Sequence, residues 1–162
     1  MTNEEIRALV SEQEDYVIHM RREFHKHPEL SGKEIHTREF LIRELEEMGV
    51  PYKKLKGTGL IAEIKGAKPG KNRVLRADID ALPLQEDAEN LKQKKACVSE
   101  IEGVCHACGH DGHMAVLLGT MKVLCKMREE LEGTVYCCFE EGEETNCGID
   151  TMMEALEAYQ VD

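Results

Sequence analysis

The sequence predicts an α/β fold in which helices flank a mostly parallel sheet. Apolar residues recur at helical spacing near both ends of the chain and once between, whereas three short segments have the composition of strands. Strands that alternate with helices of this length are typical of a sheet covered by helices. With 162 residues, the chain has the length of one ordinary domain.

The first part of the chain predicts two helices. Apolar residues recur at helical spacing over residues 6–24, Asn3 can cap the start, and Pro28 ends the segment. Ser31–Glu34 has the pattern of a capping box, so we expect a second helix after it that stops at Gly49.

The remainder alternates strands and helices around one long loop. Residues 84–103 are polar and lack periodicity, and a loop of that length is usually functional or mobile. The other predicted elements are strands over residues 60–64, 73–77 and 134–139 and helices over residues 113–127 and 149–159.

Composition and charge exclude several classes of protein. The chain carries 21 basic and 32 acidic residues, a net charge of −11, which argues against nucleic acid or an anionic membrane as partner because both need clustered Lys and Arg. The acidic start predicts no signal peptide, and no stretch approaches the ~18 apolar residues of a membrane span. Seven cysteines form an odd set without the spacing of a disulfide framework, so we expect reduced thiols and a cytoplasmic location.

Two carboxylates end the strand predicted before the long loop. Asp78 and Asp80 lie at spacing i, i+2 in the segment Arg76–Pro83. Taken alone, they are better explained by an ordinary turn, in which Asp is common. In an open α/β sheet, however, ligands gather at the carboxyl ends of strands.

The segment Cys105–His113 concentrates the most chemistry. It holds two cysteines, three histidines and one aspartate, and thiolate, imidazole and carboxylate are the ligands of a zinc-like ion. Gly109 lets the backbone turn so that Cys108 and His110 can reach one site, and the positive end of the following helix favours anionic ligands. The alternatives are a closed structural zinc site, which wants four ligands, and cysteines that only fill the core.

The acidic segment Phe139–Glu144 follows the last predicted strand. Its four carboxylates repel one another unless they are solvated, which is the alternative explanation, or share a cation. The adjacent residues Glu143 and Glu144 could have different roles, in which one binds a metal ion and the other takes a proton from a water molecule. The ion would lower the pKa of that water from about 15.7 towards ~7. Two such ions would lie ~3.5–4 Å apart, and one Cys sulfur could bridge them. A thiol amidase with Cys108 as nucleophile is the alternative without a metal.

Several segments together resemble a known family. Its pattern is found in Arg76–Pro83, in His106–His113, in Phe139 followed by the pair Glu143–Glu144, and upstream in Arg21–Ser31. These residues resemble the aminoacylase/carboxypeptidase family of dinuclear-metal amidohydrolases. More narrowly, they resemble the branch of hippurate hydrolases, N-acyl-amino-acid deacylases and auxin-conjugate hydrolases.

The resemblance implies a zinc-exopeptidase-like catalytic domain that binds two divalent ions (Zn, Mn, Ni or Co). Cys108 would bridge the ions, His110 would bind one and Glu144 the other. Glu143 would be the general base, and Asp80 would orient the centre from behind. The substrate would be a small N-acyl amino acid, cleaved at its amide bond. Asp78 stands where related branches have a metal-binding His, and its role here stays open.

The chain departs from the family in two respects. The branch usually reads Phe-Gln-Pro-Ala-Glu-Glu where this chain has Phe139–Glu144, so the loop before the Glu pair is more acidic. Family members are also much longer, with two further ligand histidines downstream and an inserted lid domain that often forms a dimer interface. Residues 1–162 therefore resemble the N-terminal portion of a single catalytic domain without the lid. The resemblance also implies that the full-length enzyme could form a homo-oligomer. The alternative is a metal-binding fragment that is inactive or needs a complementing chain.

Overall fold

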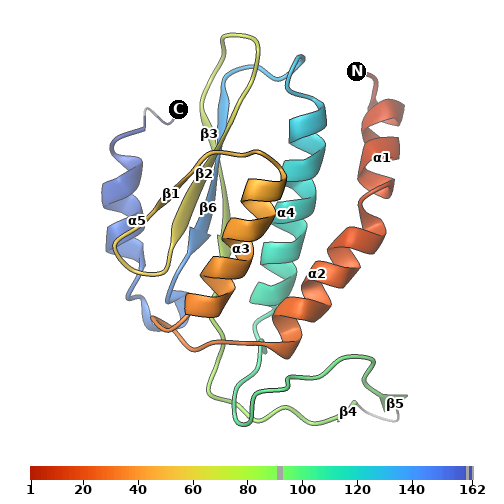
Figure 1. The fold of residues 1–162 in the computed structure, drawn as a ribbon, viewed down its shortest axis with the longest axis vertical. Helices are drawn as coiled ribbons and strands as arrows, with labels where there is room; N and C mark the ends of the chain where they lie inside the picture. Colours follow the sequence, from red (N-terminus) through yellow and green to blue (C-terminus); the bar gives the residue numbers. More distant parts are fainter. Residues whose placement is uncertain (91–92, 160, 162) are drawn as a thin grey trace.

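The computed structural model describes residues 1–90, 93–159 and 161. Its helices are α1 (Asn3–Ser11), α2 (Glu14–Lys26), α3 (Ile35–Glu47), α4 (His110–Lys126), the 3-10 helix η1 (Glu143–Thr145) and α5 (Ile149–Leu156) (Figure 1). Its strands are β1 (Tyr52–Lys54), β2 (Leu60–Lys65), β3 (Arg73–Asp78), β4 (Glu89–Asn90), β5 (Gln93–Lys94) and β6 (Thr134–Glu140).

A four-stranded sheet in the order β1-β2-β6-β3 forms the centre of the fold. β1 and β2 are antiparallel, as are β2 and β6, whereas β3 and β6 are parallel. The α/β class is confirmed, with the correction that the sheet is mixed rather than mostly parallel among the described strands. The connections explain the difference, because a short turn joins β1 to β2, whereas α4 carries the chain from the end of β3 back to the start of β6.

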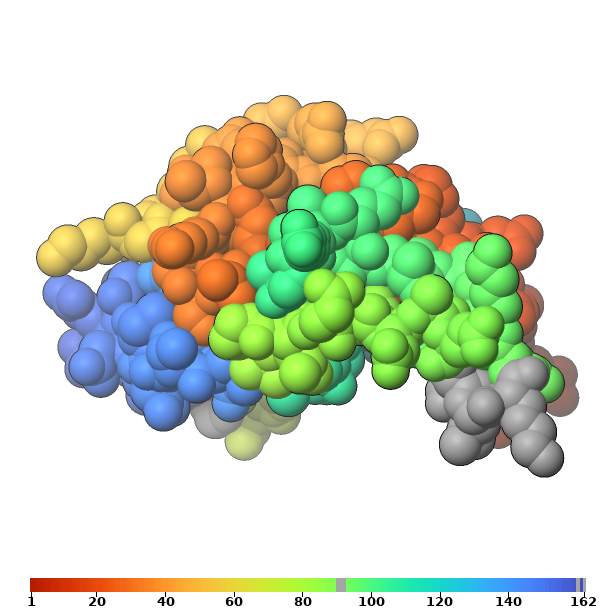
Figure 2. Space-filling model, turned by 90° about the horizontal axis from the view of Figure 1, so that it is seen from below, coloured from red at the N-terminus to blue at the C-terminus, as the bar shows by residue number. Residues whose placement is uncertain are grey.

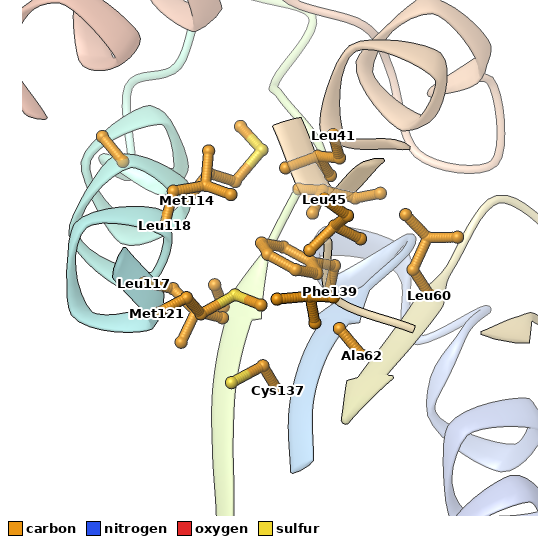
Figure 3. Close-up of a cluster of buried hydrophobic side chains, with 14 of the residues drawn as sticks. Leu41, Leu45, Leu60, Ala62, Met114, Leu117, Leu118, Met121, Cys137 and Phe139 are labelled. Carbon is orange, nitrogen blue, oxygen red and sulfur yellow. The ribbon is translucent and has the colours of Figure 1, made fainter. Parts of the chain in front are cut away.

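Helices cover both faces of this sheet. α3 and α4 lie on one face with α2 beside α4, and α5 lies on the other (Figure 1). Every residue of β6 is buried, since its side chains alternate between the two layers. Phe139 and Cys137 pack with Leu41 and the side chains of α4 (Figure 3), whereas Cys138 packs with Met152 of α5. Each large apolar side chain buried in this way stabilises the fold by about 1.5–3 kcal/mol.

The segment predicted as one N-terminal helix is divided into α1 and α2. The division falls at Glu12 and Gln13, where the buried Gln13 side-chain amide donates to the carbonyl of Leu9. The periodicity of apolar residues continues across the break, so it could not reveal the change of direction.

Two predicted helix caps are corrected by the structure. Thr2 rather than Asn3 caps α1, because the Glu5 N–H donates to the Thr2 hydroxyl and the Thr2 N–H donates to the Glu5 carboxylate. Ser31–Glu34 forms no capping box, since the serine hydroxyl donates instead to the carboxylate of Asp80. The Ser31 side chain, which the sequence predicts to cap the following helix, therefore binds Asp80 in a distant segment instead.

The remaining predicted elements are found with shifted ends. The three predicted strands are confirmed as β2, β3 and β6, α4 begins three residues earlier than expected, and α5 ends at Leu156. The predicted long loop contains the short pair β4 and β5, and its residues 91 and 92 lie outside the described residues. None of the helices in the described chain has the length and apolar character needed to cross a membrane.

Candidate metal centre

The candidate site lies where β3, β6 and α4 meet. β3 ends at Asp78 and its parallel neighbour β6 ends at Glu140, so the residues that follow both strands emerge at one edge of the sheet. Figure 2 shows this side of the molecule, with the segments that follow the two strands beside the segment between α2 and α3. Gly109 takes a φ of +86° directly before α4 and turns the chain into the helix at His110.

The His110 imidazole is the centre of the site. Its Nε2 atom lies 3.7 Å from Glu143 Oε2, 3.9 Å from Glu144 Oε1 and 3.9 Å from Asp78 Oδ2. These distances exceed a hydrogen bond, so three carboxylates surround the nitrogen without being bonded to it. His110 itself is 4% exposed. One ring nitrogen therefore faces a space bounded by carboxylate oxygens from the ends of two strands.

Asp80 holds the other side of the His110 ring. His110 Nδ1 lies 2.9 Å from the Asp80 carbonyl and 3.1 Å from Asp80 Oδ1. The second carboxylate oxygen accepts hydrogen bonds from the Ser31 hydroxyl at 2.7 Å and the Glu144 N–H at 3.0 Å. Burial by itself raises the pKa of Asp80, but these hydrogen bonds outweigh it and lower the pKa. The contacts orient the ring so that Nε2 points at the three carboxylates.

The pKa of His110 reflects the same contacts. Burial by itself lowers it, but the hydrogen bonds to Asp80 and the negative charges of Asp78 and Asp80 outweigh burial and raise the pKa to about 9. Without an ion, the imidazole is therefore protonated at neutral pH, and a metal ion that binds Nε2 must displace this proton.

Asp78 joins the site and is held by an arginine. Arg76 Nη2 lies 2.6 Å from Asp78 Oδ1, and Arg76 Nε lies 2.6 Å from Glu140 Oε2, so one guanidinium bridges the ends of β3 and β6. The other oxygen of Asp78 lies 3.4 Å from Nδ1 of His113. Asp78 is thus oriented toward both histidines of the first turn of α4.

The donor set fits a divalent cation. Two groups of side chains each place three ligand atoms within 4.8 Å of one another, namely Asp78, His110 and His113, and His110, Glu143 and Glu144. Glu144 Oε1 is buried and has no hydrogen-bond partner among the described residues. This oxygen lies 3.9 Å from His110 Nε2, so an imidazole nitrogen and a carboxylate oxygen are both available to bind one cation.

Cys108 belongs to neither of these two groups, although its thiol contacts Glu144. Its thiol is exposed, and its hydrogen bond to the Glu144 carboxylate, together with nearby negative charge, raises the pKa to about 11. A nucleophilic cysteine needs a lowered pKa, so this setting argues against the thiol amidase. The structure therefore brings together His110, Glu143, Glu144 and Asp80, with Cys108 hydrogen-bonded to Glu144.

Sequence reasoning left three contributors without a role. His113 was part of the Cys/His segment, and its spacing of i, i+3 from His110 on a helix is the signal that could have placed both on one face. Arg76 and Ser31 reach the site from positions for which no local pattern predicts a partner. The structure also leaves Asp78 facing the histidines, rather than in an ordinary turn.

An α/β sheet with imidazole and carboxylate side chains gathered beside the carboxyl ends of two parallel strands is typical of proteins that bind a ligand, such as a metal ion, at this edge. Residues 74–162, more than half of the chain, match the profile of peptidase family M20/M25/M40. The chain belongs to this family, which confirms the resemblance seen in the sequence.

Relatives of known structure or name support the assignment. The chain is 40% identical over 156 residues to thermostable carboxypeptidase 1 of Saccharolobus solfataricus (94% of this chain, 38% of that protein). It is 45% identical over 144 residues to N-acetylcysteine deacetylase of Bacillus subtilis (86% and 36%). The crystal structure of Bacillus subtilis YxeP, described as a dinuclear metal binding peptidase from the M20 family, matches with a TM-score of 0.83 and 39% identity (96% and 42%). The chain thus spans less than half the length of each.

Proposed function

We propose that residues 1–162 are the N-terminal portion of the catalytic domain of an enzyme that hydrolyses the amide bond of N-acyl amino acids. The observation that carries the proposal is the His110 imidazole, which is fixed from behind by Asp80 and directs Nε2 at carboxylates from two strand ends. The names of two relatives, N-acyl-L-amino acid amidohydrolase and N-acetylcysteine deacetylase, support the substrate class.

Two divalent ions (Zn, Mn, Ni or Co) are the proposed cofactors. His110 would bind one ion, Glu144 the other, and Cys108 would bridge them after losing its thiol proton. Such ions, when bound, polarise the amide carbonyl and make water a better nucleophile. The YxeP description as a dinuclear metal binding peptidase supports the number of ions. Asp78 and His113 are further candidate ligands, because they form the second group of donor atoms with His110.

Glu143 is the proposed general base. Its side chain is 39% exposed, whereas that of Glu144 is 18% exposed, so Glu143 is the member of the pair open to substrate and water. A carboxylate in this place can take a proton from the attacking water and pass it to the leaving amine. Asp80 would keep the His110 ring oriented throughout, since its own hydrogen bonds are all internal to the protein.

The length of the relatives is the reason for proposing a portion of a domain. The curated relatives extend well beyond the matched region, and we propose that the further length supplies additional ligands, the lid and any contacts of a homo-oligomer. A cytoplasmic location is part of the same proposal. The competing function is a metal-binding fragment that is inactive alone. One observation favours it, namely that each group of donors found among the described residues has three members.

Hydrolysis of N-acetyl- and N-benzoyl-amino acids by the purified chain, with added Mn²⁺ or Zn²⁺ and metal content measured after dialysis, tests the proposal. Activity that is lost with a chelator and restored by metal would support it, with Glu143→Gln retaining metal but not hydrolysis. Full activity in chelator would contradict it. Bound metal without turnover would favour the inactive or complementation-dependent fragment.

A further inference from the structure

We infer that Glu141 is a positioning residue which, with Glu34 and Thr58, fixes the loop that presents Glu143 and Glu144 to the proposed metal centre. The inference rests on the proposed function and deepens it. It gives a role to Glu141, which stands where the family pattern Phe-Gln-Pro-Ala-Glu-Glu has its proline.

The acidic run Glu140–Glu144 separates into buried and site-facing carboxylates. Glu140 is 2% exposed and pairs with Arg76, and Glu141 is 6% exposed. Glu143 and Glu144 instead face His110. Since burial of an unpaired carboxylate is costly, the buried members must be held by specific partners.

Glu141 is bound by the turn between β1 and β2. Its Oε2 atom accepts hydrogen bonds from the Thr58 N–H, from the Thr58 hydroxyl at 2.7 Å and from the Gly59 N–H at 3.0 Å. Three donors on one carboxylate oxygen make this a closely defined binding site for the side chain.

The room for this carboxylate depends on a glycine. A Cβ atom at Gly57 would overlap the Glu141 carboxylate, so the turn accepts that side chain because residue 57 has none. Arg38 of α3 donates to the Gly57 carbonyl at 2.8 Å and ties the turn to the helix. The turn is therefore also held by α3.

Glu34, which lies in the segment before α3, completes a clamp that consists of Glu141, Thr58 and Glu34. It is fully buried, and its Oε2 lies 2.6 Å from the Thr58 hydroxyl oxygen, while its Oε1 accepts from the Gly142 N–H at 2.8 Å. The Thr58 hydroxyl thus contacts both carboxylates. Through Glu34, the clamp reaches the residue directly before Glu143.

The backbone of the proposed base is consequently held on both sides. The Gly142 N–H is bound by Glu34, and the Glu144 N–H is bound by Asp80 at 3.0 Å. Gly142 has a φ of +59°, which a residue with a side chain adopts only with strain. The loop position of Glu143 is therefore defined although its side chain is exposed.

Thr58→Val tests the clamp, because valine keeps the size and the backbone N–H but removes the hydroxyl. Thr58→Ser restores the hydroxyl, and Thr37→Val changes a buried threonine of α3 outside the clamp as a matched control. For each variant of the chain, Co²⁺ affinity and the visible Co²⁺ spectrum would be measured, with backbone amide hydrogen exchange by NMR.

We expect Thr58→Val to lower Co²⁺ affinity by about tenfold and to speed exchange at Gly142 and Glu144. Thr58→Ser should restore both values to within about twofold, and Thr37→Val should change neither. Unchanged exchange at the two amides in Thr58→Val, or an equal change in Thr37→Val, would overturn the inference. If the unmodified chain binds no Co²⁺, the proposed metal centre fails, while the exchange data still decide whether the clamp fixes the loop.

Discussion

The two halves of the candidate metal centre differ in how firmly they are held. The half at the end of β3 and the start of α4 is buried, with Asp80 completely inaccessible and His110 fixed by it. The half on η1 is open to solvent at Glu143 and carries Glu144, whose Oε1 has no hydrogen-bond partner in the described part of the chain. One half is therefore preorganised by hydrogen bonds that an ion need not disturb, whereas the other offers carboxylate oxygens that an ion can bind.

Substitution of Asp80 should have the largest effect on stability. Asp80→Ala removes the acceptor for Ser31, His110 and the Glu144 N–H in a fully buried place, and breaking such a network costs about 3–5 kcal/mol. Glu143→Ala on the open half should change the free energy of unfolding by less than about 0.5 kcal/mol. Urea denaturation of the metal-free chain would measure both, and equal losses would remove the distinction between the halves.

The pH dependence of metal binding should separate the two proposed ligands His110 and Cys108. Their pKa values of about 9 and about 11 mean that both are protonated in the metal-free chain at pH 7. Each proton that the ion displaces makes affinity rise about tenfold per pH unit below the pKa. We expect Zn²⁺ affinity to rise about a hundredfold per unit between pH 7 and 8.

Two variants complete this pH experiment. Cys108→Ser should reduce the rise in Zn²⁺ affinity to about tenfold per pH unit, because only the His110 proton is then displaced. His110→Asn should reduce it to the same value, because only the Cys108 proton is then displaced. A tenfold slope in the unmodified chain that Cys108→Ser leaves unchanged would show that the cysteine is not a ligand, in line with its place outside the two donor groups.

The reactivity of Cys108 provides the smallest effect. Although the thiol is exposed, its pKa of about 11 leaves little thiolate at pH 8, so alkylation by iodoacetamide should be roughly tenfold slower than for an unperturbed thiol. Glu144→Gln removes the neighbouring charge and should speed the reaction. Mass spectrometry of the modified peptide would follow the reaction. Fast alkylation that Glu144→Gln does not alter would contradict the raised pKa of Cys108.

Local patterns predicted the parts of the site that lie close together in the chain. Asp78, Asp80, His110, Glu143 and Glu144 were singled out from their positions at strand ends and at a helix start, and the structure brings them together. Cys108 was singled out in the same way but lies outside both donor groups. The prediction succeeds for the other five because the carboxyl ends of adjacent parallel strands share one edge, so a pattern along the chain translates into proximity in space. Their division into a buried and an open half was not visible in this way.

The contacts that cross the fold could not be predicted from the sequence. Ser31 was assigned to cap a helix but donates to Asp80, and the capping pattern gave no sign of the distant acceptor. The acidic run was read as solvated or bound to a cation, whereas Glu140 and Glu141 are buried against Arg76 and Thr58. A polar residue shows what it can bond to, but the available partner depends on which segments the sheet brings together.

By itself, the sequence determined the α/β class, three of the four strands of the central sheet, the chemistry of the candidate metal ligands and the family. Apolar periodicity and ligand type are local properties, so they are present before the chain folds. Only the tertiary structure decided the mixed strand pairing, the orientation of His110 by Asp80 and the burial of Glu141 in the turn at Thr58. Each of these depends on hydrogen bonds between residues far apart in the chain, which form only when the sheet and its helices pack together.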